Sequence, residues 1–471
     1  MSVSLFGVLN MAGQSLSVEQ EASAVTGQNL ANVNNPAYAD QQLVVQASAP
    51  LQTTIGQEGT GVEAVSITHI WDALLNSQIT AEDSVTGSLN SQQSALQEAE
   101  GYLDEQLSGS SSSSSSASSP NGLTADLSGL FSALQTLSTD PGNISDRQAV
   151  VQKAQQLTEQ FNQVSSGLAT VSSNLNSSIQ NGVTASNQDL TEIAALNQQI
   201  IEAQNTGGTA NDLVDEREQT IENLAGYVNL TTSAQSNGAV NVSIGGVTMV
   251  SDGTTPDSLQ TYTNAGGQLM VQAQNAGTPL TLSGGSIEGA ITTRDGALAT
   301  LKSSLDTLAS QLITQVNTVY AGGYDLNGNS GQDFFTGSDA ASIGVNSALA
   351  NDPSSFQASG AAGAAGDNTV VLALANLGSQ SLAGLNNQTL SQNYSQTIAE
   401  FGSSLNSVNQ QVADSASVSQ MLSTQRTSET GVNTDTEMTN LMQFQKAYEA
   451  SAELITTVNE MLQTLVSMKT V

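Results

Sequence analysis

The sequence predicts a mainly α-helical protein in which helices from the two chain ends pair and a long helical rod carries an inserted β-rich domain. Three observations lead to this fold class. Apolar residues recur at helical spacing at both chain ends, the same spacing returns through most of the interior, and it changes to alternation between 228 and 289. Helices with such apolar stripes are stable only against a partner, so we expect them to pack together.

The C-terminal stretch from Gly431 to Val471 carries the most regular stripe. Its apolar positions follow one another in steps of three and four, and no glycine or proline interrupts it after Gly431. This pattern is typical of the seam of a coiled-coil helix. We expect the seam to be formed by Leu441, Phe444, Tyr448, Ile455, Val458, Leu462 and Leu465.

The N-terminal residues 1–35 carry a second helical stripe, which is the predicted partner. It ends at Asn34-Asn35-Pro36, because proline disfavours the helical conformation of the residue before it. We therefore predict a terminal coiled-coil domain made of 1–35 and 436–471. Two unrelated amphipathic helices are the alternative that the pattern alone leaves open.

The regions 36–227 and 291–435 are predicted to form a rod domain of long helices. Its clearest helix begins near Val150 and could exceed forty residues, which describes a rod because each residue adds ~1.5 Å. Residues 108–119 are almost pure serine and are predicted to be a solvated linker. Residues 321–390, rich in glycine, alanine, serine and asparagine, are expected to be irregular with short elements.

The region 228–290 is predicted to be a β-rich outer domain. Apolar and polar residues alternate over 240–244 and 269–273, and glycine pairs at 245–246, 266–267 and 284–285 mark turns between short strands.

Composition excludes several classes of function. A formal net charge of −34, from 42 acidic and 8 basic residues, argues against nucleic acid and anionic membranes as partners. The absence of cysteine excludes disulfides and thiolate chemistry. No run reaches the ~18 apolar residues of a membrane span. The N-terminus also lacks the basic and apolar regions of a cleavable secretory signal.

The sequence offers little catalytic or metal-binding chemistry. His69 is the only histidine, which excludes two-histidine metal sites, and we expect it to be a packing or surface residue near Trp71. Segment 325–333 places oxygen ligands at alternate positions, but it lacks the glycine at position six and the glutamate at position twelve of an EF-hand, so an Asx turn is favoured. Asp215-Glu216 beside Arg217 is interpreted as a solvated helix face. We predict no enzyme, no cofactor and no metal.

Two terminal motifs resemble the signatures of the bacterial flagellar rod, hook and hook-associated proteins. Segment 25–38, VTGQNLANVNNPAY, is similar to the family pattern N-[IL]-A-N-x-N-T-P-G-Y, with Asn35 in place of the threonine and Ala37 in place of the glycine. Segment 440–451, NLMQFQKAYEAS, and its continuation 454–465 resemble the matching C-terminal signature. The resemblance assigns an assembly signature to Asn29, Asn32, Asn34, Pro36 and Tyr38.

The middle of the chain narrows the resemblance to members that join hook to filament, because 147–162, 196–200 and 211–218 are similar to their long helices. The resemblance implies a structural protein of the extracellular flagellum, exported through the flagellar type III apparatus. It implies terminal helices that are disordered in the free monomer and form the innermost tube on assembly. The implied partners are further copies in a ring, the hook protein, the second hook-associated protein and an export chaperone.

Two alternative functions stay open. One is another axial protein of the same family, such as the second hook-associated protein or a flagellin. The other is an extracellular adhesin or enzyme carried on axial ends, whose site would have to lie in 228–290 or 321–390.

Overall fold

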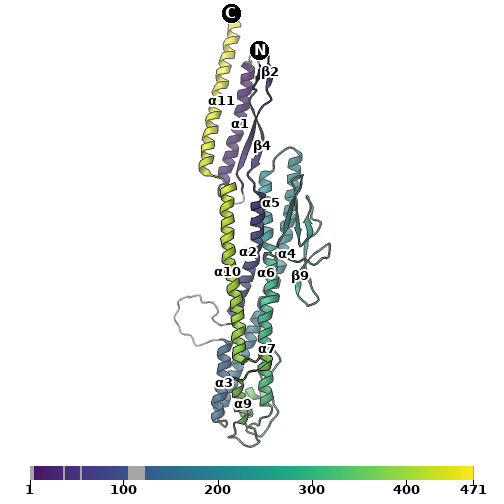
Figure 1. Cartoon of the computed structure of the whole chain (residues 1–471), viewed down its shortest axis with the longest axis vertical. Coiled ribbons are helices and arrows are strands. Elements are labelled where there is room, and N and C mark those ends of the chain that lie inside the picture. Colours follow the sequence, from purple (N-terminus) through teal and green to yellow (C-terminus); the bar gives the residue numbers. More distant parts are fainter. Residues whose placement is uncertain (1–4, 36–37, 54–55, 104–121, 470–471) are drawn as a thin grey trace.

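The computed structural model is an elongated, mainly helical rod with both chain ends at the same tip (Figure 1). The structure describes residues 5–35, 38–53, 56–103 and 122–469. The predicted serine linker at 108–119 and Pro36 of the predicted signature lie outside these residues. Within them, no helix is both long enough and apolar enough to cross a membrane. The predicted fold class, with paired terminal helices and inserted β-structure, is confirmed.

The terminal helices α1 (Leu5–Asn32) and α11 (Thr434–Lys469) lie side by side at this tip (Figure 1). They run antiparallel, since Asn29 contacts Glu437 and Ser15 contacts Ser451. The buried face of α1 is a helical stripe that includes Ala12, Val18, Ala22 and Val25. We call α1 and α11 together the terminal pair.

An antiparallel hairpin follows α1 and packs along it. Its long strands are β1 (Gln41–Ala47) and β4 (Val62–His69), and β2 (Leu51–Thr53) and β3 (Gly56–Glu58) pair nearer its end. Val44, Val45, Leu51 and Val65 are exposed on it. The hairpin lies beyond the predicted boundary at residue 36 and yet belongs spatially with the terminal pair. That boundary stays a prediction.

The rod below the terminal pair, which we call the stem, is built from seven of the described helices, most of them long. They are α2 (Ala73–Leu103), α3 (Leu123–Thr139), α4 (Ile144–Asn205), α5 (Asn211–Tyr227), α6 (Gly285–Thr293), α7 (Ala299–Tyr320) and α10 (Leu390–Thr430). A π-helical turn, Arg294–Leu298, joins α6 to α7. The helix predicted near Val150 is confirmed and has 62 residues. Its first turn is capped by Asn143, whose side chain accepts hydrogen bonds from Ser145 N and Asp146 N.

The stem helices approach closely where glycine replaces a side chain. A Cβ atom on Gly87 of α2 would lie 2.2 Å from the carbonyl oxygen of Gly226, near the end of α5. One on Gly289 of α6 would lie 2.3 Å from Ser88 O. Any larger residue at either position would therefore push α2 away from its neighbours.

The β-rich insertion lies on one side of the stem (Figure 1). Strands β5 (Thr231–Ala234), β6 (Val240–Ile244) and β7 (Val247–Val250) form one antiparallel sheet, and β8 (Leu259–Thr263) pairs with β9 (Leu269–Ala273). Val240, Val242 and Ile244 are buried, as their alternation predicts. These residues are continuous with the stem core, so strands and stem share one buried cluster.

The lower end of the stem holds the region predicted to be irregular, with α8 (Ser347–Asn351), α9 (Thr369–Leu377) and the short strands β10 (Phe335–Thr336) and β11 (Gly344–Val345). The Asp325 carboxylate accepts hydrogen bonds from Asn327 N and Asn329 N, which is the Asx turn favoured from sequence. Among the described residues, no group of three or more metal-ligating side chains gathers.

Candidate functional site

Two residues of the predicted assembly signature, Asn29 and Tyr38, lie in a compact polar network centred on Asn29. This residue lies in the last turns of α1 and is only 1% exposed. Its side-chain oxygen accepts a hydrogen bond from the Tyr38 hydroxyl at 2.8 Å and another from Gln41 N at 3.1 Å. The chain after α1 therefore turns back and is held against the helix end.

The side-chain nitrogen of Asn29 donates hydrogen bonds to three further oxygen atoms. It donates to Asp40 Oδ1 at 2.6 Å, to the Gln41 carbonyl at 2.9 Å and to Glu437 Oε2 at 3.2 Å. Glu437 lies in the first turn of α11. One buried amide thus joins the end of α1, the start of β1 and the start of α11, because an amide supplies both donors and an acceptor.

A second set of contacts ties this network to the stem. Ala39 N donates to Asp215 Oδ2 at 3.2 Å, and Gln41 Nε2 donates to Asp212 Oδ1 at 2.7 Å. Both aspartates lie on α5. The amide of Asp40 also donates to the carbonyl of Thr430, the last residue of α10. We call Asn29, Tyr38, Asp40, Gln41, Asp212, Asp215 and Glu437 the joint, because they connect the terminal pair to the stem.

The joint concentrates negative charge. In the part of the chain that the structure describes, Asp40, Asp212, Asp215 and Glu437 form no ion pair with lysine or arginine. Burial raises the pKa of Asp215 to about 6; the Ala39 amide and His69 oppose the increase, and Asp212 and Glu218 add to it. Burial and the nearby Glu437 also raise the pKa of Asp40.

Tyr38 stays protonated in this environment, because burial and the surrounding carboxylates raise the pKa of its hydroxyl. It can therefore act as the donor to Asn29. His69 packs edge-on against Trp71 with ring centroids 5.6 Å apart, as expected from sequence.

The structure brings only part of the predicted signature together. Asn29 and Tyr38 meet, whereas Asn32 donates only to Gln28 O within its own helix and Asn34 is exposed. Pro36 lies outside the described residues. The assembly role of this signature stays a prediction.

Sequence reasoning missed the acidic members of the joint, and it was wrong about Asp215. That residue is 7% exposed and neighbouring Arg217 is 4% exposed, so neither side chain lies on a solvated face, whereas Glu216 between them is exposed as interpreted from sequence. Arg217 donates to Asn197 Oδ1 and to Gly238 O, inside the contact between stem and strands. The solvated interpretation failed for Asp215 and Arg217 because Ala39 packs against the first and the loop at Gly238 against the second.

The predicted seam of α11 is only partly covered by α1. Val458 is buried, and Leu441, Phe444, Ile455 and Leu462 are half-buried. Tyr448 and Leu465 remain 41% and 53% exposed. Further apolar side chains on α11 are exposed, namely Met438, Met442, Leu454, Met461, Val466 and Met468. An apolar surface of this extent along one helix is typical of an interaction site.

A groove of about 470 Å³ lies at the foot of the terminal pair, between α1, the hairpin and α11. Its apolar lining comes from Val18, Ala22, Val25, Leu43, Val45, Val62 and Phe444. Its polar lining includes the acidic side chains of Glu19, Asp40 and Glu437. We call this cavity the foot groove.

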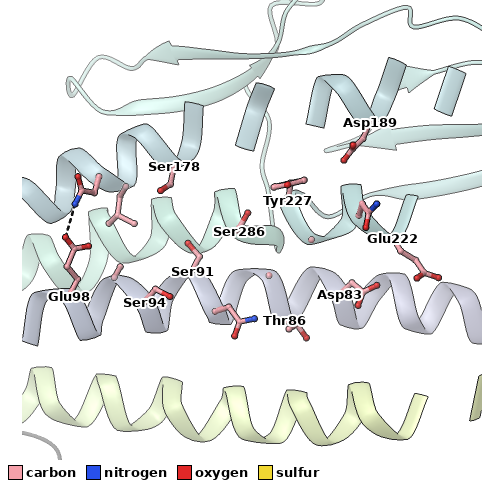
Figure 2. A pocket seen from close by; sticks show the side chains of 17 residues that line it. Asp83, Thr86, Ser91, Ser94, Glu98, Ser178, Asp189, Glu222, Tyr227 and Ser286 are labelled. Carbon is pink, nitrogen blue, oxygen red and sulfur yellow. Dashed lines mark hydrogen bonds between the residues drawn. The ribbon is translucent and has the colours of Figure 1, made fainter. Parts of the chain in front are cut away.

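A second cavity, about 940 Å³, is an open polar trough along α2, α4, α5 and α6 (Figure 2). Figure 2 shows hydroxyl and carboxylate side chains spread along it, with Glu98 bonded to Asn174. Burial raises the pKa of Asp83 to about 6, with a smaller contribution from Glu222. Burial likewise raises the pKa of Asp189 to about 6, with a smaller contribution from Glu192. The carboxylates are distributed along the trough without a histidine or a cation among its lining residues, so they form no acid–base or nucleophilic constellation.

Comparison with known families gives two matches. The family described as "Flagellar hook-associated protein FlgK helical domain" matches residues 110–335. The family described as "Flagellar basal body rod FlgEFG protein C-terminal" matches residues 423–468.

Individual proteins are similar to the chain over different shares of their length. Flagellar hook-associated protein 1 of Bacillus subtilis strain 168 is 28% identical over 511 aligned residues, which cover 98% of each chain. Flagellar hook-associated protein 1 of Salmonella typhimurium strain LT2 is 26% identical, and the match covers 70% of this chain and 59% of that relative. The solved flagellar hook junction protein FlgK from Burkholderia pseudomallei aligns over 55% of this chain and 46% of that chain, with 24% identity and a TM-score of 0.48.

Proposed function

The chain belongs to the family of flagellar hook-associated proteins, and we propose that copies of it assemble, through their terminal pairs, into a ring-like junction that carries the filament on the hook. It is a structural component of the extracellular flagellum and not an enzyme. Of the alternatives considered from sequence, the relatives support neither a flagellin nor a catalytic protein on axial ends.

The observation that carries this proposal is the incompletely covered apolar face of the terminal pair. Tyr448 and Leu465 belong to the predicted seam, yet α1 leaves them exposed. Burying an apolar side chain of this size stabilises by about 1.5–3 kcal/mol, so copies placed side by side gain free energy at each such position. We propose that seam residues line the innermost tube of the assembly.

The joint gives the terminal pair a fixed direction relative to the stem. Asn29 and Glu437 hold both terminal helices at one point, and Asp212 and Asp215 attach that point to α5. A ring of many copies requires such a fixed direction, because each subunit must present the same surfaces at the same angle. We propose that the joint supports assembly by this positioning.

The partners are components of hook and filament. We propose the hook protein on one side of the ring and the second hook-associated protein on the other. An export chaperone would cover the apolar stripe of α11 before assembly, because that stripe requires a partner in water.

The test is deletion of the gene from the bacterium that carries it, followed by complementation. We expect hooks without filaments and flagellin released into the medium, and restored filaments when the gene is returned. Antibody labelling should place the chain between hook and filament. Normal filaments in the deletion strain would overturn the proposal.

A further inference from the structure

The outer face of α11 carries a small exposed patch that α1 does not cover. Met438, Met442 and Lys446 are spaced by four residues, so they form one stripe on the helix. Met438 is 53% exposed, Met442 is 59% exposed, and the side chain of Lys446 is 78% exposed. We call these three residues the outer patch.

The outer patch and the foot groove lie on opposite sides of α11. The helix contributes Thr436, Glu437, Asn440 and Phe444 to the groove. At about 100° per residue, the centre of the outer patch lies about 180° around the helix from the centre of those four residues. A single copy therefore cannot place its outer patch in its own groove.

The two surfaces also lie at the same height along the rod. The contacts of Asn29 with Glu437 and of Ser15 with Ser451 fix the register of the antiparallel helices. In this register, Met442 lies at the level of the groove residues Ala22 and Val25, and Lys446 lies at the level of Glu19. Farther along α11, the same outer face is acidic, because it carries the exposed residues Glu449, Glu453 and Glu460.

The chemistry of the two surfaces is complementary. The groove offers apolar side chains from α1, the hairpin and Phe444, with Glu19 on its lining, and burial raises the pKa of that carboxyl. The patch offers two methionines, whose flexible side chains fill irregular apolar spaces, and a lysine whose described ion partner is the exposed Glu449.

We propose that the outer patch of one copy of this chain occupies the foot groove of the next copy beside it, with Met438 and Met442 among the apolar side chains and Lys446 next to Glu19. The occupant is a second copy because the patch and the groove stand at equal heights on opposite sides of one helix. Such a contact is head-to-tail and repeats around a ring. It rests on the proposed function, since it assigns the lateral contact of the proposed ring.

Cysteine cross-linking tests this contact in the full chain, which has no cysteine of its own. Flagella assembled from an Ala22→Cys/Met442→Cys variant are oxidised and analysed under denaturing conditions. We expect a ladder of dimers, trimers and higher species, because each copy uses one cysteine in each of two contacts. No disulfide can form within one copy, because Met442 points away from α1.

The matched control is Ala22→Cys/Glu460→Cys. Glu460 lies on the same outer face, and 18 residues at ~1.5 Å each place it ~27 Å from Met442. We expect no ladder from this pair. A ladder from the control, a complete absence of ladder from the test pair in flagella that carry filaments, or cross-linked dimers from Met442→Cys alone would overturn the proposal.

Charge exchange provides a second readout that needs no cross-link. Lys446→Glu should reduce the fraction of hooks that carry filaments, and adding Glu19→Lys should restore it. No reduction, or no restoration in a double variant that folds with normal stability, would overturn the lateral contact. Either result leaves the proposed function intact, because that function is tested by the deletion strain and its complementation with the unaltered chain.

Discussion

Asn29 in the last turns of α1 and Glu437 in the first turn of α11 are 408 positions apart in sequence and are joined by a hydrogen bond of 3.2 Å. This contact brings the two ends of the chain to one point. Asn29 also satisfies Tyr38, Asp40 and Gln41, so a single buried amide organises the connection between terminal pair and stem.

Replacing Asn29 with alanine should therefore weaken the joint. The change leaves the Tyr38 hydroxyl and the Gln41 amide without their acceptor, and each unsatisfied buried group costs about 1–3 kcal/mol. We expect a loss of about 2–6 kcal/mol in the free energy of unfolding of the joint. Trp71 is the only tryptophan and lines a cavity next to Tyr38, so its fluorescence during urea unfolding reports on this region.

Asn32→Ala is the matched control, because Asn32 makes one exposed hydrogen bond within its own helix. The free energy of unfolding of this variant should stay within about 0.5 kcal/mol of that of the original chain. Equal effects of the two substitutions would show that the buried network contributes nothing special.

The stability of the joint should depend on pH. The pKa of Asp215 is about 6 in the folded chain, above the ordinary aspartate value of 3.8, so the folded state binds this proton more tightly than the unfolded chain does. The stabilisation is complete below the unfolded pKa and is lost as the pH rises through about 6. Asp40 acts in the same direction. We expect the free energy of unfolding, obtained from the urea unfolding curve of Trp71 fluorescence, to decrease by on the order of 2 kcal/mol between pH 4 and pH 6.5.

Asp215→Asn should flatten this dependence. The asparagine oxygen can still accept the Ala39 amide, while the carboxylate charge is removed. The variant should be at least as stable as the original chain at pH 7. A slope of unchanged size in the variant would assign the pH effect to other groups. Unfolding midpoints are compared, and not fluorescence intensities, because the intensity of Trp71 also depends on its contact with the His69 ring.

The parts of the structure that sequence could predict are those with local repeats. The stripes of α1 and α11 are periodic, so their pairing followed from the need of each for a partner. The joint could not be predicted in the same way, since Ala39 reaches Asp215 over 176 positions and Asn29 reaches Glu437 over 408. Buried carboxylates at such positions have the same local pattern as solvated ones, and only the fold distinguishes them.

The seam of α11 gives a prediction about assembly. Ile455→Asp places a charge at a half-buried position of the terminal pair, and burying it against a neighbouring copy costs several kcal/mol. We expect the variant to be exported but to leave hooks without filaments, with flagellin in the medium. Thr457→Asp, on the exposed side of α11, should support normal motility. Normal motility of Ile455→Asp would contradict a buried role for this helix.

The free monomer should show whether the terminal pair needs its neighbours. Amides of 5–32 and 434–469 should exchange hydrogen faster than those of the α4 core around Leu157 and Phe161, because the terminal pair buries fewer apolar side chains. Exchange is measured on a chain shown to be monomeric by sedimentation. Equal protection of both regions would mean that the pair is stable before assembly.

The β-rich insertion offers the last test, because it shares its core with the stem. Asn197 of α4 donates to Val240 O and to Asp252 O, and Arg217 of α5 donates to Gly238 O. Replacing 232–288 with a Gly/Ser linker removes these acceptors and uncovers the apolar residues of α4 near Ile193. Two buried polar side chains that lose partners cost about 1–3 kcal/mol each, so the upper half of α4 and α5 should lose protection from hydrogen exchange.

The matched control for that replacement changes only the exposed turn 264–267 to another turn sequence, which leaves every contact with α4 in place. It should behave as the original chain in hydrogen exchange. In the 232–288 replacement, the lower stem around Leu127 and Leu157 should stay protected, since its core lies beyond the strands. Unchanged protection of α4 and α5 in that variant would contradict the shared core and would show that the stem folds independently of the insertion. Loss of protection along the whole stem would mean instead that rod and strands unfold as one cooperative unit.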